Sequence, residues 1–232
     1  MKKFLKILMI LLLIGLSIAL LIIGNGYTMY KEAIEKEPLE EKVTEIRGKE
    51  SYTEFSELPQ MYVNAVISVE DKRFFKHGGI DIIAIGRAAI NDIKAMSYVE
   101  GGSTITQQLA KNMYFTQEKI MERKIAEVFM AWKIEANYSK EDIFELYVNS
   151  IYFGNGYYTV REACKGYFNK DISEMTDYEC IMLAGIPNAP SVYAPTVNPE
   201  LAKQRQKQVM DKMIENGYLT EEEAEEILKQ AE

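Results

Sequence analysis

The sequence is poor in cysteine: Cys164 and Cys180 are the only two among 232 residues. Small exported domains often depend on several disulfides, and two cysteines do not make such a framework. A single disulfide between them is one open alternative, and two buried thiols that pack as small hydrophobic side chains are the favoured one. The remaining composition, with 47% hydrophobic and 27% charged residues, is that of one ordinary globular domain plus an appendage.

Positive charge is scarce as well. The formal net charge at pH 7 is −8, and the lysines of the N-terminal segment leave the rest of the chain more acidic than that. Nucleic-acid binding relies on a positively charged surface, so no nucleic-acid partner is expected. Basic residues that gather in one motif of such an acidic chain are therefore informative.

Strand patterns, internal repeats and a nucleophile elbow are also lacking. Without that elbow, the single histidine, His77, is interpreted as a structural hydrogen-bonding residue rather than a catalytic base. Helix-start signals recur instead at capping-box spacing: Ser139 with Asp142, Thr159 with Glu162, Thr176 with Glu179, and Thr220 with Glu223. The sequence predicts an all-α domain, with at most one short hairpin near the glycines.

A long apolar run marks the N-terminus. Ile7 to Ile23 has no charged residue, and with its flanks the run would span about 30 Å as a helix, the thickness of a bilayer core. Lysines precede it and no Lys or Arg follows until Lys31, so the positive-inside rule predicts a cytoplasmic N-terminus. A cleaved signal peptide is the alternative, but the run continues well past the small residues at 17–19. Residues 4–24 are predicted to be a single-pass anchor.

The part outside the membrane divides into a tether and a domain. Residues 25–50 are charged and contain few large apolar side chains, so we interpret them as a partly helical tether that lifts the domain off the membrane. Residues 51–232 form the expected domain.

A predicted buried helix that ends in charged residues is the first candidate site. The segment after Pro59 is apolar nearly all round, and Glu70 and Asp71 follow at its C-terminal end. Helix-end carbonyls and an apolar environment disfavour a negative charge, which makes Glu70 a candidate general base. Asp71 can hold local backbone N–H groups. Read alone, this stretch is equally consistent with two solvated loop acids.

Two further stretches are rich in polar and basic residues. Residues 101–102 are glycines before a run of hydroxyl and amide side chains at a predicted helix start, which favours anions, and Lys111 lies on the same helix. Lys119, Arg123 and Glu127 are four residues apart on the next helix and form one polar stripe. A capped polar turn and an ordinary salt-bridge ladder are the structural alternatives.

Two later stretches are rich in aromatic residues, glycine or proline. Residues 147–158 combine tyrosines with glycines, and residues 183–195 are rich in proline. The tyrosines could stack on sugar rings or could simply be core residues.

Five stretches in this order resemble the peptidoglycan glycosyltransferase family (glycosyltransferase family 51), the lipid II polymerases of bacterial cell walls. They read EDKRFFKHGGID, GGSTITQQLAKNMY, RKIAEVF, YVNSIYFGNGYYTVREACKGYF and LAGIPNAPSVYAP, and the resemblance covers about residues 55–200. The first two stretches together are highly specific. Because the chain stops at residue 232, a monofunctional member with a single anchor and no transpeptidase domain is expected.

The resemblance implies a mostly α fold, with a lysozyme-like head lobe and a smaller membrane-associated jaw lobe at about residues 80–115. It implies that Glu70 is the general base and Glu127 the second essential carboxylate. It further implies that substrate is bound by Ser103, Thr104, Gln107, Gln108, Lys111, Asn112, Lys119, Arg123, Lys124 and Asn149. The residues expected to support the site are Asp71, Phe74, His77 and Gly102. Ala126 stands where some members carry a basic residue, which removes one phosphate contact.

The implied reaction polymerises lipid II. The 4-hydroxyl of one lipid II attacks the anomeric carbon of the growing lipid-linked chain, undecaprenyl diphosphate leaves, and inversion gives a β-1,4 linkage. Cationic side chains could stabilise the leaving group, helped by Mg²⁺ or Mn²⁺ held mainly through the substrate diphosphate. The expected partners are lipid II, the growing lipid-linked glycan chain, the membrane and other cell wall synthesis proteins.

Two other classes of function stay open. A lysozyme-like enzyme that cleaves glycan would also use a glutamate in a helical fold, but it would not need the basic stripe. A non-catalytic membrane scaffold would need no acid at Glu70.

Overall fold

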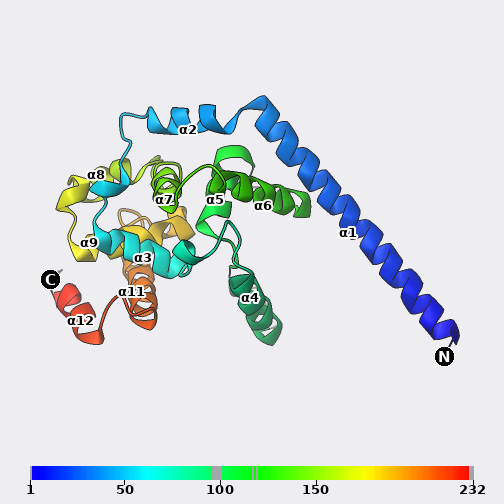
Figure 1. The fold of residues 1–232 in the computed structure, drawn as a ribbon. Coiled ribbons are helices and arrows are strands. Elements are labelled where there is room, and N and C mark those ends of the chain that lie inside the picture. The colour runs from blue at the N-terminus through cyan, green and yellow to red at the C-terminus, as the bar shows by residue number, and fades with distance from the viewer. Residues whose placement is uncertain (1, 96–100, 117, 119, 230–232) are drawn as a thin grey trace.

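The computed structural model describes residues 2–95, 101–116, 118 and 120–229, and within this part all regular elements are helices, apart from one isolated bridge between Gly78 and Ile80 (Figure 1). The α-helices are α1 (Lys2–Lys36), α2 (Leu39–Arg47), α3 (Gln60–Glu70), α4 (Ile82–Ala95), α5 (Ile105–Tyr114), α6 (Met121–Glu135), α7 (Lys140–Val148), α8 (Val160–Phe168), α9 (Asp177–Gly185), α10 (Pro190–Tyr193), α11 (Pro199–Glu215) and α12 (Glu221–Lys229). Short 3₁₀ turns lie at η1 (Phe55–Glu57), η2 (Phe74–Lys76), η3 (Ile172–Glu174) and η4 (Ile186–Asn188). The prediction of a mostly α-helical fold with one N-terminal apolar helix is confirmed.

Helix α3 lies at the centre of the core. It begins directly after Pro59, whose fixed φ suits a helix start, and it packs against α9 and α11. Tyr62, Val66 and Ile67 are at most 2% exposed, so this helix is apolar on most of its surface, as its sequence predicts. Helix α5 packs against α6 and α7 on the other side of the core.

The two cysteines belong to this core. Cys164 and Cys180 are both buried and unpaired. Burial raises the pKa of the Cys164 thiol to about 11 and that of Cys180 to about 12. The favoured interpretation, two buried thiols without a disulfide, is confirmed.

The segment interpreted as a tether is helical and packs on the domain. Helix α1 continues to Lys36, and α2 follows after Pro38. Leu39, Val43 and Ile46 of α2 are buried in the core. Their spacing puts them on one helix face, so a few apolar side chains suffice to attach an otherwise charged helix. This segment therefore does not hang free between membrane and domain.

Two apolar helices project from the body of the molecule (Figure 1). In the described part of the chain, α1 is the one helix long and apolar enough to cross a membrane. Helix α4 exposes Ile82 and Ile93, whose exposed fractions are 77% and 75%. Helix α5 falls within the predicted jaw range but is buried in the body. The boundaries of the predicted domains and lobes stay predictions.

Candidate active site

Glu70 is the last residue of α3 and faces a cavity of about 690 Å³. Its Oε2 accepts a hydrogen bond of 2.7 Å from Nε2 of Gln108 on α5. Burial raises the pKa of Glu70 above its usual 4.5, and the Gln108 bond, Arg205 and Lys111 oppose this shift without cancelling it. A carboxylate with a raised pKa is a better proton acceptor near neutral pH.

Gln108 is itself oriented by the core. The hydroxyl of buried Tyr147 donates to its Oε1 at 3.3 Å. The chain Tyr147–Gln108–Glu70 thus fixes the direction of one carboxylate oxygen of Glu70.

Asp71 links the end of α3 to the start of α5. Both of its carboxylate oxygens lie 2.9 Å from Nε2 of His77. The carboxylate also accepts a 3.1 Å hydrogen bond from the backbone N–H of Ile105. A carboxylate at a helix N-terminus is electrostatically favourable. Phe74 packs under this loop, fully buried, against Phe144. Asp71, Phe74 and His77 therefore hold the loop that follows Glu70.

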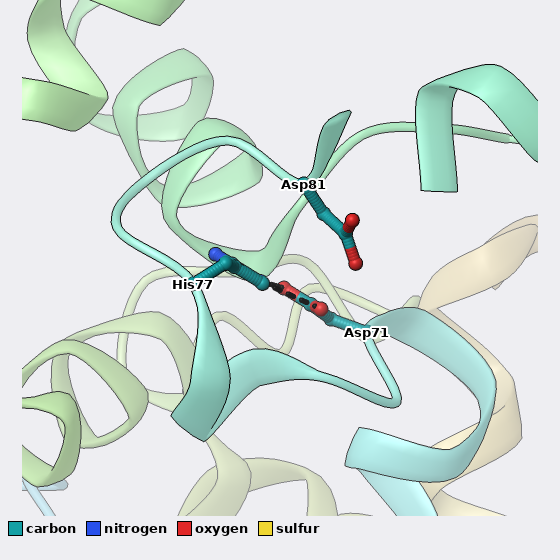
Figure 2. A group of neighbouring side chains, drawn as sticks. All are labelled: Asp71, His77 and Asp81. Atoms are coloured by element: carbon teal, nitrogen blue, oxygen red, sulfur yellow. Dashed lines mark hydrogen bonds and ion pairs between the residues drawn. The ribbon is translucent and has the colours of Figure 1, made fainter. Parts of the chain in front are cut away.

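Among the described residues, one group of side chains comes close enough to hold a metal ion: Asp71, His77 and Asp81 (Figure 2). In Figure 2 the dashed lines join His77 to Asp71 alone. Asp81 instead accepts two hydrogen bonds from the guanidinium of Arg73, at 2.8 and 2.5 Å. The Arg73 pair is the main cause that lowers the pKa of Asp81 to about 2. A cation here would have to displace Arg73, so this group fits a hydrogen-bonded network and not a metal site.

The second motif forms the start of α5. Thr104 is the N-cap: its Oγ1 accepts from the backbone N–H of Gln107 at 3.1 Å and donates to the carbonyl of Gly79 at 2.6 Å. The side chain of Gln107 accepts in return from the backbone N–H of Thr104. A Cβ on Gly102 would lie 3.3 Å from the backbone of Ile85, so glycine lets this turn approach α4 closely.

The third motif lies on α6 and is a charged cluster. Glu127 is 1% exposed, and its carboxylate accepts hydrogen bonds from Arg123 and, at 2.7 Å, from Lys124. Lys124 Nζ also donates to Ser103 Oγ at 2.7 Å. Glu127 therefore does not line the cavity; it reaches the cavity wall through Lys124 and Ser103. A buried carboxylate with two cationic partners holds those cations in place.

Lys111 connects this cluster electrostatically to Glu70. Burial and nearby Arg123 lower the pKa of Lys111, whereas Glu70 raises it. Burial is also the main cause that lowers the pKa of Lys124 to about 8, with Arg123 and Lys111 adding to the effect. The cations repel one another, so a bound anion would relieve that repulsion.

The cavity gathers part of the predicted site. The predicted residues that line it are Glu70, Asp71, Gly102, Ser103, Thr104 and Gln108. Lys111, Arg123, Lys124 and Glu127 lie behind this wall, linked as described above. Asn112 is exposed on α5, and Gln107 is buried as a capping residue. Lys119 lies outside the described residues.

Asn149 is not brought to the cavity. It is fully buried and bonds the backbone of Thr53 in both directions: its Oδ1 accepts from the N–H at 3.0 Å, and its Nδ2 donates to the carbonyl at 2.8 Å. Its Nδ2 also donates to the carbonyl of Glu145 at 2.9 Å. In this structure Asn149 joins the segment before α3 to α7, and its contact with substrate stays a prediction.

Another part of the cavity wall comes mainly from residues that the sequence did not single out, apart from Asn188 in the stretch at residues 183–195. Arg205 and Lys212 of α11 line it, together with Asn188 and Asn216. Arg205 is held by the carbonyl of Gly185 at 3.4 Å and by the ring of Tyr193, 5.8 Å from its guanidinium carbon. No local pattern marks these side chains as site residues, because they reach the cavity only through the packing of α11 on α3 and α9.

Comparisons with known proteins identify the family of this chain. The profile of the transglycosylase family, described as "Transglycosylase", matches residues 37–214. Penicillin-binding protein 1A of Neisseria gonorrhoeae is 44% identical over 182 residues, which cover 78% of this chain and 23% of the relative. Penicillin-binding protein 1A of Aquifex aeolicus (strain VF5) is 46% identical over 178 residues, covering 77% of this chain and 24% of the relative.

A solved structure is also similar. The crystal structure of penicillin-binding protein 1A from Haemophilus influenzae matches 54% of this chain and 16% of that chain, at 26% identity and a TM-score of 0.37. The chain spans about a quarter of the length of the curated relatives it matches. Because the family profile covers more than half of the 232 residues, the chain belongs to the transglycosylase family.

Proposed function

We propose that this protein is a peptidoglycan glycosyltransferase that polymerises lipid II into β-1,4-linked glycan strands at the cell membrane. The observation that carries the proposal is a partly buried glutamate with a raised pKa, Glu70, in a cavity whose wall is backed by the cations of α5 and α6. Family membership supports the same reaction class.

Glu70 acts as the general base. It accepts the proton of the acceptor 4-hydroxyl as that oxygen attacks the anomeric carbon of the donor. The bond from the anomeric carbon to the diphosphate breaks, and undecaprenyl diphosphate leaves with the electron pair. The hydrogen bond from Gln108 holds one carboxylate oxygen of Glu70, so the other remains to meet the hydroxyl.

The leaving diphosphate needs charge stabilisation rather than protonation. Lys111, Lys124 and Arg123 supply positive charge behind Ser103, whose hydroxyl lines the cavity. Glu127 keeps Arg123 and Lys124 together. The role of Glu127 is thus to position cations and not to exchange a proton.

A divalent cation would be bound mainly by the substrate and not by carboxylates of the protein. Among the described residues, the carboxylates of Asp71, Asp81 and Glu127 are already engaged by nitrogen donors. Mg²⁺ or Mn²⁺ would therefore be held mainly by the diphosphate of the substrate, and the chemistry it would supply is charge neutralisation. No step above depends on it.

The two apolar helices support a placement at the membrane. Helix α1 would cross the bilayer with its N-terminus in the cytoplasm, because its lysines precede the apolar run. Helix α4, which lines the cavity through Ala84, Arg87 and Asn91, exposes isoleucines toward the lipid. The cavity would then open beside the membrane that holds lipid II, outside the cytoplasm. Other cell wall synthesis proteins are further expected partners.

The test compares full-length wild type with Glu70→Gln on lipid II in detergent, with polymer length and released undecaprenyl diphosphate as readouts. We expect wild type to make polymer and Glu70→Gln to be slower by about 10²- to 10⁴-fold, the usual contribution of a general base. Glu222→Gln, the same change at an exposed position on α12, is the matched control. Wild type that only cleaves glycan would indicate a hydrolase, and wild type that does neither would indicate a scaffold. A folded Glu70→Gln protein that polymerises normally would refute the assigned base.

A further inference from the structure

The anchor helix is longer than a bilayer requires. At 1.5 Å per residue, the 35 residues of α1 are about 52 Å long, whereas a bilayer core is about 30 Å thick. The C-terminal part of α1 therefore emerges as helix, without a break, and packs on α6. Gly26, Tyr30, Ala33 and Ile34 share one face of α1, and the last three pack against the hydrophobic core.

Gly26 allows the closest approach of the two helices. It is buried, and a Cβ placed on it would lie 2.6 Å from Cβ of Ile125 and 2.7 Å from the backbone oxygen of Glu122. Real Cβ atoms do not come this close, so any side chain at residue 26 must push α1 and α6 apart. A Cβ on Gly24, two residues earlier, would meet no atom within 4 Å.

Aromatic rings extend this contact along α6. The ring of Phe129 lies 5.1 Å from that of Tyr27 and 5.9 Å from that of Tyr30, centroid to centroid. On its other side Phe129 meets Trp132, at 5.7 Å. Such ring pairs prefer tilted and edge-to-face geometry, as seen here, and add to the energy of burial.

The opposite face of α6 carries the charged cluster. With 3.6 residues per turn, Glu122, Ile125 and Phe129 lie on one side of the helix. The cations and carboxylate of the site, at 123, 124 and 127, lie on the other. Helix α6 is thus held between α1 on one side and α5 on the other.

We infer that α1 is a positioning element of the active site and not only a membrane anchor. Packing at Gly26 fixes α6 so that Lys124 stays at 2.7 Å from both Ser103 and Glu127. A displacement of about 1 Å would break these hydrogen bonds, and misplacement on that scale can reduce a rate by about 100-fold. The same contact sets the height of the site above the membrane. The inference rests on the proposed function.

The experiment uses the full chain in lipid vesicles, with Gly26→Leu against the matched control Gly24→Leu. Both variants remain apolar enough to insert, so flotation with the vesicles should be equal. Trp132, the single tryptophan of the chain, lies in the contact and reports on it by emission wavelength and acrylamide quenching. The third readout is the kcat and KM for lipid II, and the fourth is the melting temperature. Gly26→Ala gives a smaller perturbation in case the leucine variant does not fold.

We expect Gly26→Leu to shift the Trp132 signal and to lower kcat by at least about 10-fold while vesicle binding is unchanged. Gly26→Ala should fall between it and wild type, and Gly24→Leu should match wild type. A contact that only stabilises the fold would lower the melting temperature and leave the kcat of the folded fraction unchanged, which would overturn the inference. Equal kcat in Gly26→Leu and wild type would do so as well. If wild type itself makes no polymer, the proposed function fails instead, which the wild-type arm reveals separately.

Discussion

The chemistry proposed for Glu70 depends on a balance between burial and nearby cations. Burial raises the pKa of its carboxyl group, while Gln108, Arg205 and Lys111 lower it by less. The same cations, Lys111 among them, are available to stabilise the negative charge of the substrate. Arg205 completes this arrangement from another part of the cavity wall.

A substitution of Asn149 can distinguish a structural role of this residue from a role in substrate binding. Replacement by alanine would leave the backbone N–H and carbonyl of Thr53 buried without their partner. We expect Asn149→Ala to lower the free energy of unfolding by roughly 2–6 kcal/mol, since two buried groups lose their partner and each costs about 1–3 kcal/mol. Denaturant titration in detergent measures this loss, with exposed Asn137→Ala as the control. A rise in KM without loss of stability would instead indicate contact with substrate.

The predictability of the site differs from residue to residue. Glu70 stands out because a buried apolar helix ends in an acid, but only the family resemblance favours it over a solvated loop acid. Helical spacing puts Arg123 and Glu127 on one stripe of α6, whereas Lys124 is indicated by the resemblance alone.

Arg205 and Lys212 could not be predicted, because only tertiary packing brings them to the cavity. The sequence alone does not reveal the capping by Gln107 or the backbone bridging by Asn149, because amide side chains serve these purposes as readily as ligand binding.

At the scale of elements, most helices can be predicted from local sequence signals, whereas the attachment of α1 and α2 to the domain cannot. Capping boxes mark the starts of α7 and α9, so those helices begin where the sequence predicts. The segment interpreted as a tether, residues 25–50, has mainly charged residues, and such a composition is typical of a linker. Gly26 and the apolar face of α2 instead attach it to the domain.

Helix α4 offers a test of membrane contact. Ile82 and Ile93 are each at least 75% exposed, so replacing both with serine should change stability by less than about 0.5 kcal/mol per site. We expect the double variant to raise the KM for lipid II in vesicles by roughly 3-fold or more, because each isoleucine buried in lipid is worth about 1.5–3 kcal/mol. Leu228→Ser, at an exposed position of α12, is the control. An unchanged KM would show that α4 does not touch the bilayer.

For the whole molecule, the acidic charge and the cationic site are compatible. The net charge of −8 disfavours anionic polymers in general, whereas the cations near the cavity are concentrated behind one wall and held by Glu127. Helices α1 and α4 both project from the helical body (Figure 1), which would place the cavity beside the lipid substrate. The anchor, the cavity and the charged cluster then form one unit.

The central claim, that Glu70 is a base with a raised pKa, is tested most directly by the pH dependence of kcat/KM for lipid II in wild type and in Glu70→Gln. In wild type the rate should rise as pH increases through a value above 4.5, because Glu70 accepts a proton only when ionised. It should fall again near pH 8 as Lys124 loses its charge. The residual rate of Glu70→Gln should lack the acid limb and keep the alkaline one. The same acid limb in both proteins would contradict the assignment of Glu70 as the base.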